Sequence, residues 1–157
     1  SSCVGEGPFT AEYFGAAAEK LREAGGEYGA ATGRPRRVGP FDVVASRYGI
    51  RCQGADEIAL TKLDILSGYE EIEICTAYEL DGQRITEFPF PDALDGCKPV
   101  FEKVKGWNCD ITGCRTFEDL PAEARSYVEF IEDLAHTRVS IIGVGAEREQ
   151  IINRFWK

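Results

Sequence analysis

The sequence predicts an α/β fold in which helices flank a mixed sheet with one β-hairpin. Helical spacing of apolar residues in 10–25 and 121–135 predicts two of the helices. Residues 72–80 alternate between apolar and mostly polar side chains, which is typical of a strand with one buried face. Asp81-Gly82 follows directly and indicates a tight turn into a second strand over 83–88.

Two helices are expected before residue 55. Thr10 can cap the first, and Gly25-Gly26 ends it. Pro40 is well placed to begin the second. Their inner faces are predicted to be Phe14, Ala17, Ala18 and Leu21 in the first and Phe41, Val44, Ala45 and Tyr48 in the second.

The rest of the chain adds strands and the most regular helix. Residues 58–66 read as a buried strand that runs into a turn near Ser67-Gly68, and 99–104 as an edge strand. Pro121 opens a helix with strict 3.6-residue periodicity, and 139–142 is a short strand. We find no internal repeat, and 157 residues suit a single domain by default.

Composition excludes several functional classes. The net charge of -9 argues against general binding to nucleic acids or anionic membranes, because both need a basic face. No apolar run approaches the roughly 18 residues of a membrane span. The six cysteines form no C-x-x-C pair and His136 is the only histidine, so a zinc site is not expected. Buried, reduced thiols of a cytoplasmic protein are favoured over a disulfide framework.

The loop from Gly29 to Gly39 carries three arginines in four positions, at 34, 36 and 37. Guanidinium groups suit carboxylates and phosphates, and glycines let backbone N–H groups approach an anion closely. A helix starting at Pro40 would add the dipole of its N-terminus. The loop is therefore predicted to bind a small anion. The alternative is a solvated loop whose arginines meet acidic neighbours.

Thr61-Lys62-Leu63-Asp64, at the end of an apolar strand, is a second informative motif. The Asp64 carboxylate can accept hydrogen bonds from both N1–H and the 2-amino group of guanine, which adenine does not offer. The Lys62 side chain can brace the loop beside the base. The motif predicts guanine recognition.

Both motifs, in this order and spacing, are part of a longer match, because nearly the whole chain resembles the C-terminal part of the adenylosuccinate synthetase family. The matching segments are Val4 to Phe9, Glu27 to Ala30, Thr32 to Arg37, Leu60 to Asp64, Glu87 to Pro89, Phe117 to Pro121 and Val139 to Ile142.

The resemblance implies a cytoplasmic ligase of AMP biosynthesis that joins IMP and L-aspartate at the expense of GTP, through a 6-phosphoryl-IMP intermediate. It implies GTP as co-substrate, a homodimeric enzyme, and Mg²⁺ held by residues outside this chain. The family's phosphate loop, its catalytic aspartate and histidine and its magnesium ligands belong to its N-terminal half. Residues 1–157 would thus be the C-terminal portion, with no catalytic residue or metal ligand.

The same resemblance assigns the binding residues. Those expected to bind L-aspartate and IMP are Ala30, Ala31, Thr32, Gly33, Arg34, Pro35 and Arg36. Those expected to bind GTP are Arg36, Lys62, Leu63, Asp64, Gly143, Val144 and Gly145. In that family the backbone amides of the loop and the residue matching Thr32 take one carboxylate, while Arg34 would reach toward IMP and Arg36 toward GTP.

Some positions differ from the family pattern. Ala31 stands in place of a threonine, Cys3 of an arginine and Pro40 of an aromatic residue. Gly143 and Ala146 stand in a turn that more often reads Ser-x-Gly-Pro. We expect weaker aspartate binding and a looser guanine pocket from these changes. Three hypotheses follow: an enzyme portion inactive by itself, a guanine-nucleotide-binding module without catalysis, or a domain with no retained ligand.

Overall fold

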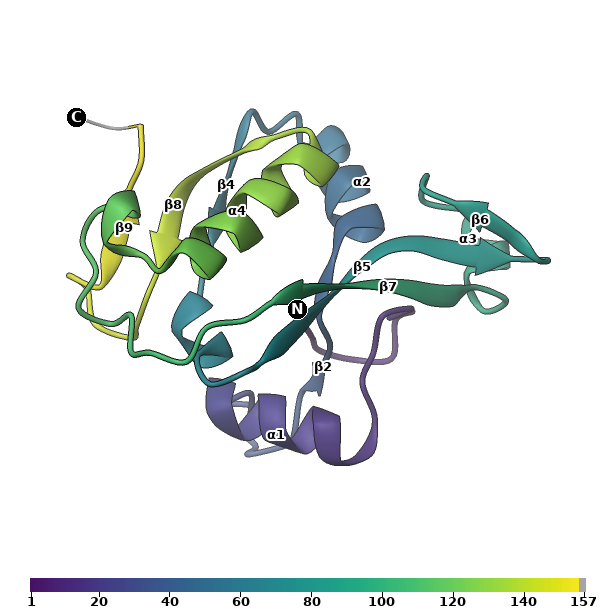
Figure 1. Cartoon of the computed structure of the whole chain (residues 1–157). Helices are drawn as coiled ribbons and strands as arrows, with labels where there is room; N and C mark the ends of the chain where they lie inside the picture. Colours follow the sequence, from purple (N-terminus) through teal and green to yellow (C-terminus); the bar gives the residue numbers. More distant parts are fainter. Residues whose placement is uncertain (156–157) are drawn as a thin grey trace. The chain divides into compact units, whose positions relative to one another are not determined.

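The computed structural model describes residues 1–155 (Figure 1). Its contacts divide the chain into two compact units, one of residues 1–48 and 73–102 and the other of residues 49–72 and 103 onward. The elements are, in order, β1 (Ser2–Cys3), α1 (Gly15–Gly25), β2 (Arg37–Val38), β3 (Phe41–Asp42), α2 (Val43–Gln53), β4 (Glu57–Leu60), η1 (Leu63–Leu66), β5 (Glu71–Leu80), β6 (Gln83–Ile85), α3 (Pro91–Leu94), β7 (Lys98–Lys105), η2 (Phe117–Asp119), α4 (Ala122–Ala135), β8 (Arg138–Gly143) and β9 (Ile151–Asn153). The predicted mixed α/β class is confirmed.

The sheet of the first unit is mixed. Strand β5 pairs in parallel with β3, antiparallel with β6, and also with β7. The predicted hairpin between β5 and β6 is confirmed, and Asp81 and Gly82 at its turn have φ angles of 52° and 76°. Two positive φ angles are what a type I′ turn requires. The core beside this sheet contains Ala11, Val44, Cys75, Tyr78 and Leu94.

Helix α1 begins four residues later than a cap at Thr10 would predict. Thr10 does not cap it; the helix starts at Gly15 after Phe14, whose side chain gives no cap hydrogen bond. Phe14 is 77% exposed and so is not part of the buried face, which is formed by Ala18 and Leu21. The predicted end is confirmed, because Gly26 takes the left-handed conformation with φ 58°.

Helix α2 begins at Val43, not at Pro40. The loop ends in strand β2, and strand β3 separates it from the helix, so the predicted position of the loop directly before a helix N-terminus is wrong. Asp42 precedes the helix, and its Oδ1 accepts a hydrogen bond from the backbone N–H of Ala45 at 3.0 Å. The positive end of α2 is thereby satisfied by a carboxylate of the chain itself.

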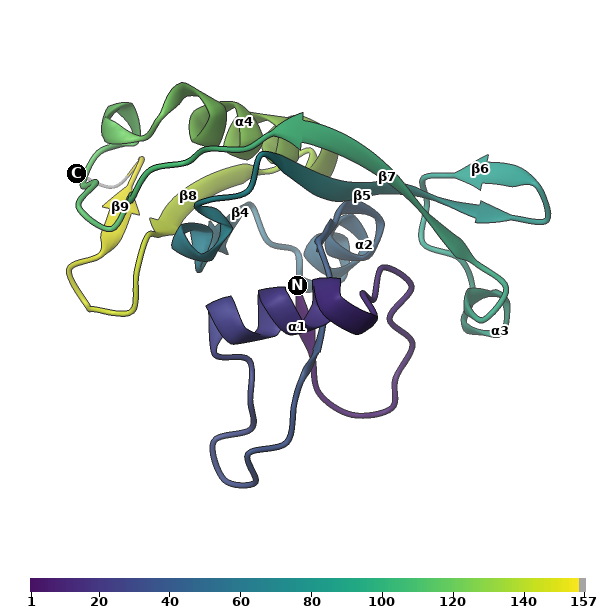
Figure 2. The same cartoon turned by 60° about the horizontal axis from the view of Figure 1, so that its bottom comes forward.

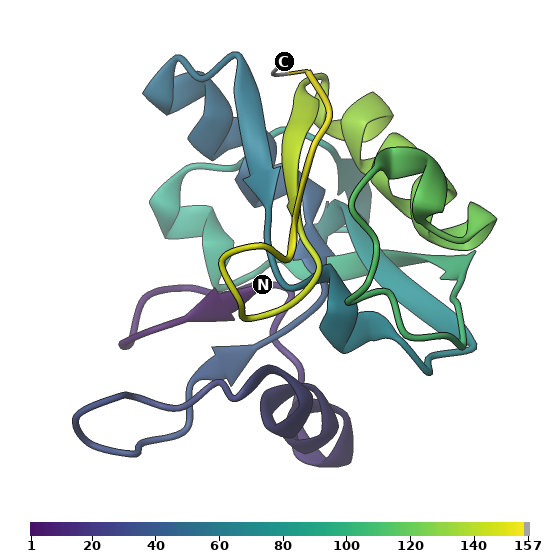
Figure 3. The same cartoon turned by 90° about the vertical axis from the view of Figure 1, so that its left-hand side faces the viewer.

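In the second unit, β8 pairs in parallel with β4 and antiparallel with β9, and α4 packs along β8 (Figures 1 and 3). Strand β4 ends at Leu60, so the predicted strand over 58–66 is wrong in its second half. There Lys62 takes a left-handed conformation with φ 58°, and residues 63–66 form the 3₁₀ helix η1. The guanine motif therefore lies on a turn and a short helix.

The predicted helix after Pro121 is confirmed as α4. Its buried residues are Ala124, Tyr127, Val128, Ile131 and Ala135. His136 ends the helix in a left-handed conformation and is exposed.

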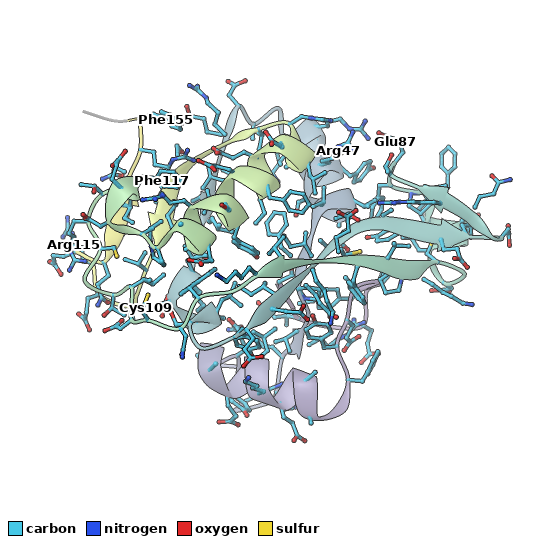
Figure 4. All side chains as sticks on the ribbon, in the orientation of Figure 1. Arg47, Glu87, Cys109, Arg115, Phe117 and Phe155 are labelled. Carbon is cyan, nitrogen blue, oxygen red and sulfur yellow. The ribbon has the colours of Figure 1, made fainter. Side chains whose placement is uncertain are left out.

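The Arg154 side chain connects the segment after β9 to other elements of the second unit. Its guanidinium lies 4.0 Å from the centre of the Phe117 ring and 5.1 Å from that of Phe155, two rings marked in Figure 4. It also pairs with Glu132 of α4 at 2.6 Å and donates to the Val139 carbonyl at 3.0 Å. One side chain thus joins the C-terminal segment to η2, α4 and β8.

All six cysteines carry free thiols, but the prediction that these thiols are buried holds only for Cys75. Cys52 and Cys109 are exposed, and the others are intermediate. Within residues 1–155, no helix combines the length and apolar character that crossing a membrane requires.

Candidate functional site

The arginine loop is a closed hairpin at the end of α1 (Figure 2). The Arg36 amide donates to the Glu27 carbonyl and the Gly29 amide to the Arg34 carbonyl, both at 2.9 Å. The Gly33 amide donates back to the Gly29 carbonyl at 2.7 Å, and Gly33 has a φ of 64°. These bonds give the loop a paired stem and a tight tip.

The tip presents backbone and hydroxyl groups to solvent. Ala30, Ala31 and Thr32 are exposed, and their amides form no backbone hydrogen bond with the residues that the structure describes. The Thr32 hydroxyl accepts from the Arg34 amide at 3.3 Å. A Cβ atom at Gly29 would lie 2.9 Å from this hydroxyl oxygen, so a larger residue here would displace the Thr32 hydroxyl. The tip can therefore offer three N–H donors and a hydroxyl to an anion.

The three arginines have different surroundings. Arg36 forms an ion pair of 3.0 Å with Glu27, and Arg37 forms one of 2.6 Å with Glu12. The Arg34 side chain is exposed and has no partner among residues 1–155. Acidic neighbours thus hold two of the arginines, as the alternative interpretation of the loop expected, and Arg34 alone keeps an uncompensated charge.

Arg37 also holds the glycine-rich segment before α1. Its guanidinium donates to the carbonyls of Gly5 and Gly7 and lies 5.7 Å from the centre of the Phe9 ring. Its position is thus fixed by several contacts within the first unit. They make Arg37 a structural residue.

The guanine motif contains a buried carboxylate oxygen without a partner. Leu63 is 1% exposed and anchors η1, and Asp64 stands in its first turn. Asp64 Oδ1 is buried and accepts no hydrogen bond from the described residues. Leaving a buried acceptor unpaired costs about 1–3 kcal/mol, and more when it is charged. Such an oxygen is suited to a ligand that brings N–H donors.

The turn after β8 lies against this motif. Because β4 and β8 are parallel and Leu60 pairs with Ile142, residues 61–64 and 143–145 lie at the carboxyl ends of neighbouring strands. A Cβ atom at Gly143 would lie 3.4 Å from the Lys62 amide nitrogen. The structure thus brings together the two predicted halves of the guanine site, at the end of a parallel strand pair where ligands commonly bind.

Gln150 shapes that turn and was missed by sequence reasoning. Its carbonyl accepts from the Val144 amide, and its Oε1 from the Glu147 amide, both at 2.9 Å. A Cβ atom at Gly145 would lie 2.1 Å from Gln150 Oε1, so the glutamine side chain fills the space that Gly145 leaves. No local pattern marks Gln150, because its role arises only when the turn closes.

The first unit also has a cavity that the sequence did not indicate. It has a volume of about 290 Å³, and its lining includes Phe9, Asp42, Ser46, Tyr78 and Phe88. The Tyr78 hydroxyl donates to Asp42 Oδ2 at 2.6 Å. Burial raises the pKa of Asp42, while the bonds from Tyr78 and from the amides of Ala45 and Val44 oppose the shift.

Metal binding has no support in the described part of the chain. Among residues 1–155, no three His, Cys, Asp or Glu side chains lie close enough to hold a metal ion. The donor set of these described residues therefore does not fit Mg²⁺.

Comparisons with known proteins agree with one another. The sequence profile of the adenylosuccinate synthetase family matches residues 1–152. An adenylosuccinate synthetase of Pelobacter propionicus is 51% identical over 150 residues, which cover 95% of this chain and 35% of that protein. One of Staphylococcus epidermidis is 47% identical, covering 99% of this chain and 37% of that protein. The chain thus spans little more than a third of the length of these relatives.

A solved structure is similar over almost the whole chain. The fully ligated adenylosuccinate synthetase of Plasmodium falciparum superposes with a TM-score of 0.91 at 38% sequence identity. The match covers 98% of this chain and 38% of that one.

Proposed function

Since the chain belongs to the adenylosuccinate synthetase family, we propose that it supplies the guanine-recognition and L-aspartate-binding parts of a GTP-dependent ligase acting on IMP. The observation that carries this proposal is the buried, unpartnered Oδ1 of Asp64 within the guanine motif.

Asp64 would select the base by accepting two hydrogen bonds from guanine. The ionised carboxylate has only acceptors, which match N1–H and the 2-amino group of guanine. Adenine would leave the buried oxygen unpaired, at a cost of about 1–3 kcal/mol. Lys62 and Leu63 hold Asp64 in its turn, and the backbone of Gly143, Val144 and Gly145 would line the opposite side of the base.

The loop tip would bind L-aspartate. The amides from Ala30 to Thr32 and the Thr32 hydroxyl suit one carboxylate, and the exposed Arg34 supplies a charge beside them. Gly33 and Pro35 complete the tip and the stem. We assign Arg34 toward IMP and Arg36 toward GTP, as the resemblance implies.

Chemistry at the γ-phosphate needs groups that these residues do not provide. Phosphoryl transfer depends on positioning and on charge neutralisation around Mg²⁺. Because the described donor set does not fit that ion, we derive no step through it and propose that the isolated chain is inactive by itself. The homodimeric assembly and a cytoplasmic location are proposed for the complete enzyme only.

A second candidate is a module that binds guanine nucleotides without catalysis. The same Asp64 oxygen favours it, because all residues proposed to contact the base belong to the second unit. Thermal shift separates the candidates. Stabilisation by GMP, GDP and GTP alike supports base binding by this chain alone, and no response to any of them leaves the enzyme-portion interpretation.

The proposal is tested with a variant that should prefer a xanthine nucleotide over a guanine nucleotide. In the Asp64→Asn variant the amide can donate where the carboxylate could only accept, so preference should move from GDP toward xanthosine diphosphate. NMR titration of the 157-residue chain with both nucleotides gives the two affinities. Asp56→Asn, an exposed carboxylate before β4, is the control and should keep the preference for GDP. An unchanged preference in Asp64→Asn would show that Asp64 does not contact the base.

A further inference from the structure

We propose that Gln150 is a positioning residue for base recognition, which closes the turn after β8 and thereby fixes the Gly145 amide as the donor to the 6-oxygen of guanine. The inference rests on the proposed function, because it takes guanine to bind beside Asp64. Gln150 lies outside the residues that the sequence motifs assign to GTP, and the comparisons give it no role.

The first step is that one residue closes the turn between β8 and β9 (Figure 3). The Gln150 carbonyl accepts from the Val144 amide at 2.9 Å, and the Gln150 amide donates to the Glu147 carbonyl at 3.0 Å. Its side-chain Oε1 accepts from the Glu147 amide at 2.9 Å. Three hydrogen bonds of Gln150 therefore set the path of this turn.

The second step is the contact between the Gln150 carboxamide and Gly145. A Cβ atom at Gly145 would lie 2.1 Å from Gln150 Oε1 and 2.4 Å from its Cδ, so the carboxamide packs on the glycine backbone where a side chain would stand. Gly145 is half-buried, and its amide forms no hydrogen bond with residues 1–155. An unpaired amide that is already held in place can bond a ligand without the cost of ordering a loop.

The third step is the hydrogen-bonding pattern of the base. Beside N1–H and the 2-amino group, guanine carries the 6-oxygen, which is an acceptor. The Asp64 carboxylate has only acceptors, so the 6-oxygen needs an N–H donor from another residue. The turn is the neighbouring element, because a Cβ atom at Gly143 would lie 3.4 Å from the Lys62 amide nitrogen. Gly145 of this turn therefore supplies the donor that Asp64 lacks.

The test compares GDP with 6-thio-GDP, in which sulfur, a weak acceptor, replaces the 6-oxygen while the N1–H and 2-amino donors remain. NMR titration of the 157-residue chain gives both affinities. Gln150→Met keeps the length of the side chain but removes its carboxamide, so GDP should bind about three- to tenfold more weakly. The affinity for 6-thio-GDP should change by less than about twofold, because that ligand accepts no strong hydrogen bond from the Gly145 amide. Gln83→Met, the same change at an exposed position on β6, is the control and should leave both affinities unchanged.

The comparison of the two nucleotides separates positioning from a merely structural role. A turn that only loses stability would weaken the binding of both nucleotides equally. That result, or no change for either nucleotide in Gln150→Met, would overturn the inference. Gln150→Glu keeps an acceptor at the same atom and should retain the preference of the wild type for GDP over 6-thio-GDP.

A measurement on the wild type keeps the inference testable should Gln150→Met fail to fold. The Gly145 amide proton should shift downfield when GDP is added, and less with 6-thio-GDP, because it enters a hydrogen bond only with the 6-oxygen. An unchanged Gly145 resonance in a chain that binds GDP would overturn the inference and leave the proposed function standing. No binding of GDP at all would instead contradict the proposed function.

Discussion

Three acidic side chains with poorly solvated oxygens have different partners and therefore different roles. Glu27 is paired with Arg36, and Asp42 accepts from Tyr78 and from the first turn of α2. Asp64 Oδ1 has no partner among the described residues. Satisfied groups belong to the structure, and the unsatisfied one indicates a ligand.

The contribution of Asp42 to the free energy of unfolding should decrease as the pH rises. Burial raises its pKa, so the folded state holds this proton more tightly than the unfolded state. The stability that Asp42 contributes is therefore present at low pH and is lost as the pH rises through its folded pKa. The free energy of unfolding of the wild type minus that of Asp42→Asn should fall from about pH 3 to about pH 7. Urea unfolding followed by circular dichroism measures this difference.

Asp110 is a control, because its contribution to stability should change with pH in the opposite direction. Hydrogen bonds from the Thr112 amide and hydroxyl lower its pKa, so its contribution is lost as the pH falls through the folded value. The difference between the wild type and Asp110→Asn should therefore rise over the same pH range. Equal signs for the two aspartates would refute the burial argument for Asp42.

At the scale of elements, the backbone just after β7 packs closely against the backbone just before β5. The Gly106 amide, just after β7, donates to the Glu70 carbonyl at 2.8 Å. A Cβ atom at Gly106 would lie 1.9 Å from the Tyr69 carbonyl oxygen. Because that neighbour is backbone, no side-chain movement can relieve the contact.

Gly106→Ala should destabilise the second unit by about 3 kcal/mol or more, since the segments around residues 69 and 106 must separate. Gly113→Ala is the matched control, because its Cβ atom would meet no atom within 4 Å. That variant should change stability by less than about 1 kcal/mol. Urea unfolding monitored by tryptophan fluorescence is suitable, because the buried Trp107 directly follows Gly106 in the sequence. Equal stabilities of the two variants would contradict the close approach.

At the scale of the whole molecule, each of the two compact units carries one of the proposed ligand-binding elements. The first holds the arginine loop, and the second holds both parts of the proposed guanine site. The chain spans 35% to 37% of the length of the relatives reported above. Ligand binding by a single unit is thus a separate question from turnover.

We expect the 157-residue chain alone to form no adenylosuccinate from IMP, L-aspartate and GTP in the presence of Mg²⁺. The reason is that phosphoryl transfer needs a positioned metal ion, and the described residues offer no group of ligands for one. Absorbance of the product measures the reaction. Turnover that disappears in Asp64→Asn would show an active chain and contradict the proposal.

Sequence determined what depends on neighbouring residues. Asp81-Gly82 encoded its hairpin because both residues accept the positive φ angles of the turn. The spacing of apolar residues after Pro121 encoded α4, and contiguous motifs identified the family. The start of α2 was misjudged because Pro40 is a local signal, whereas Asp42, which the fold places at the helix N-terminus, caps it.

Only the tertiary structure decided how charge is distributed among the site residues. The sequence gives Arg34, Arg36 and Arg37 the same chemistry, but Glu27 and Glu12 reach two of them and leave Arg34 uncompensated. Likewise, Asp64 became a candidate with physical support when the fold buried its Oδ1 without a donor. Pairing and burial depend on groups that are distant in the sequence, so no local pattern contains them.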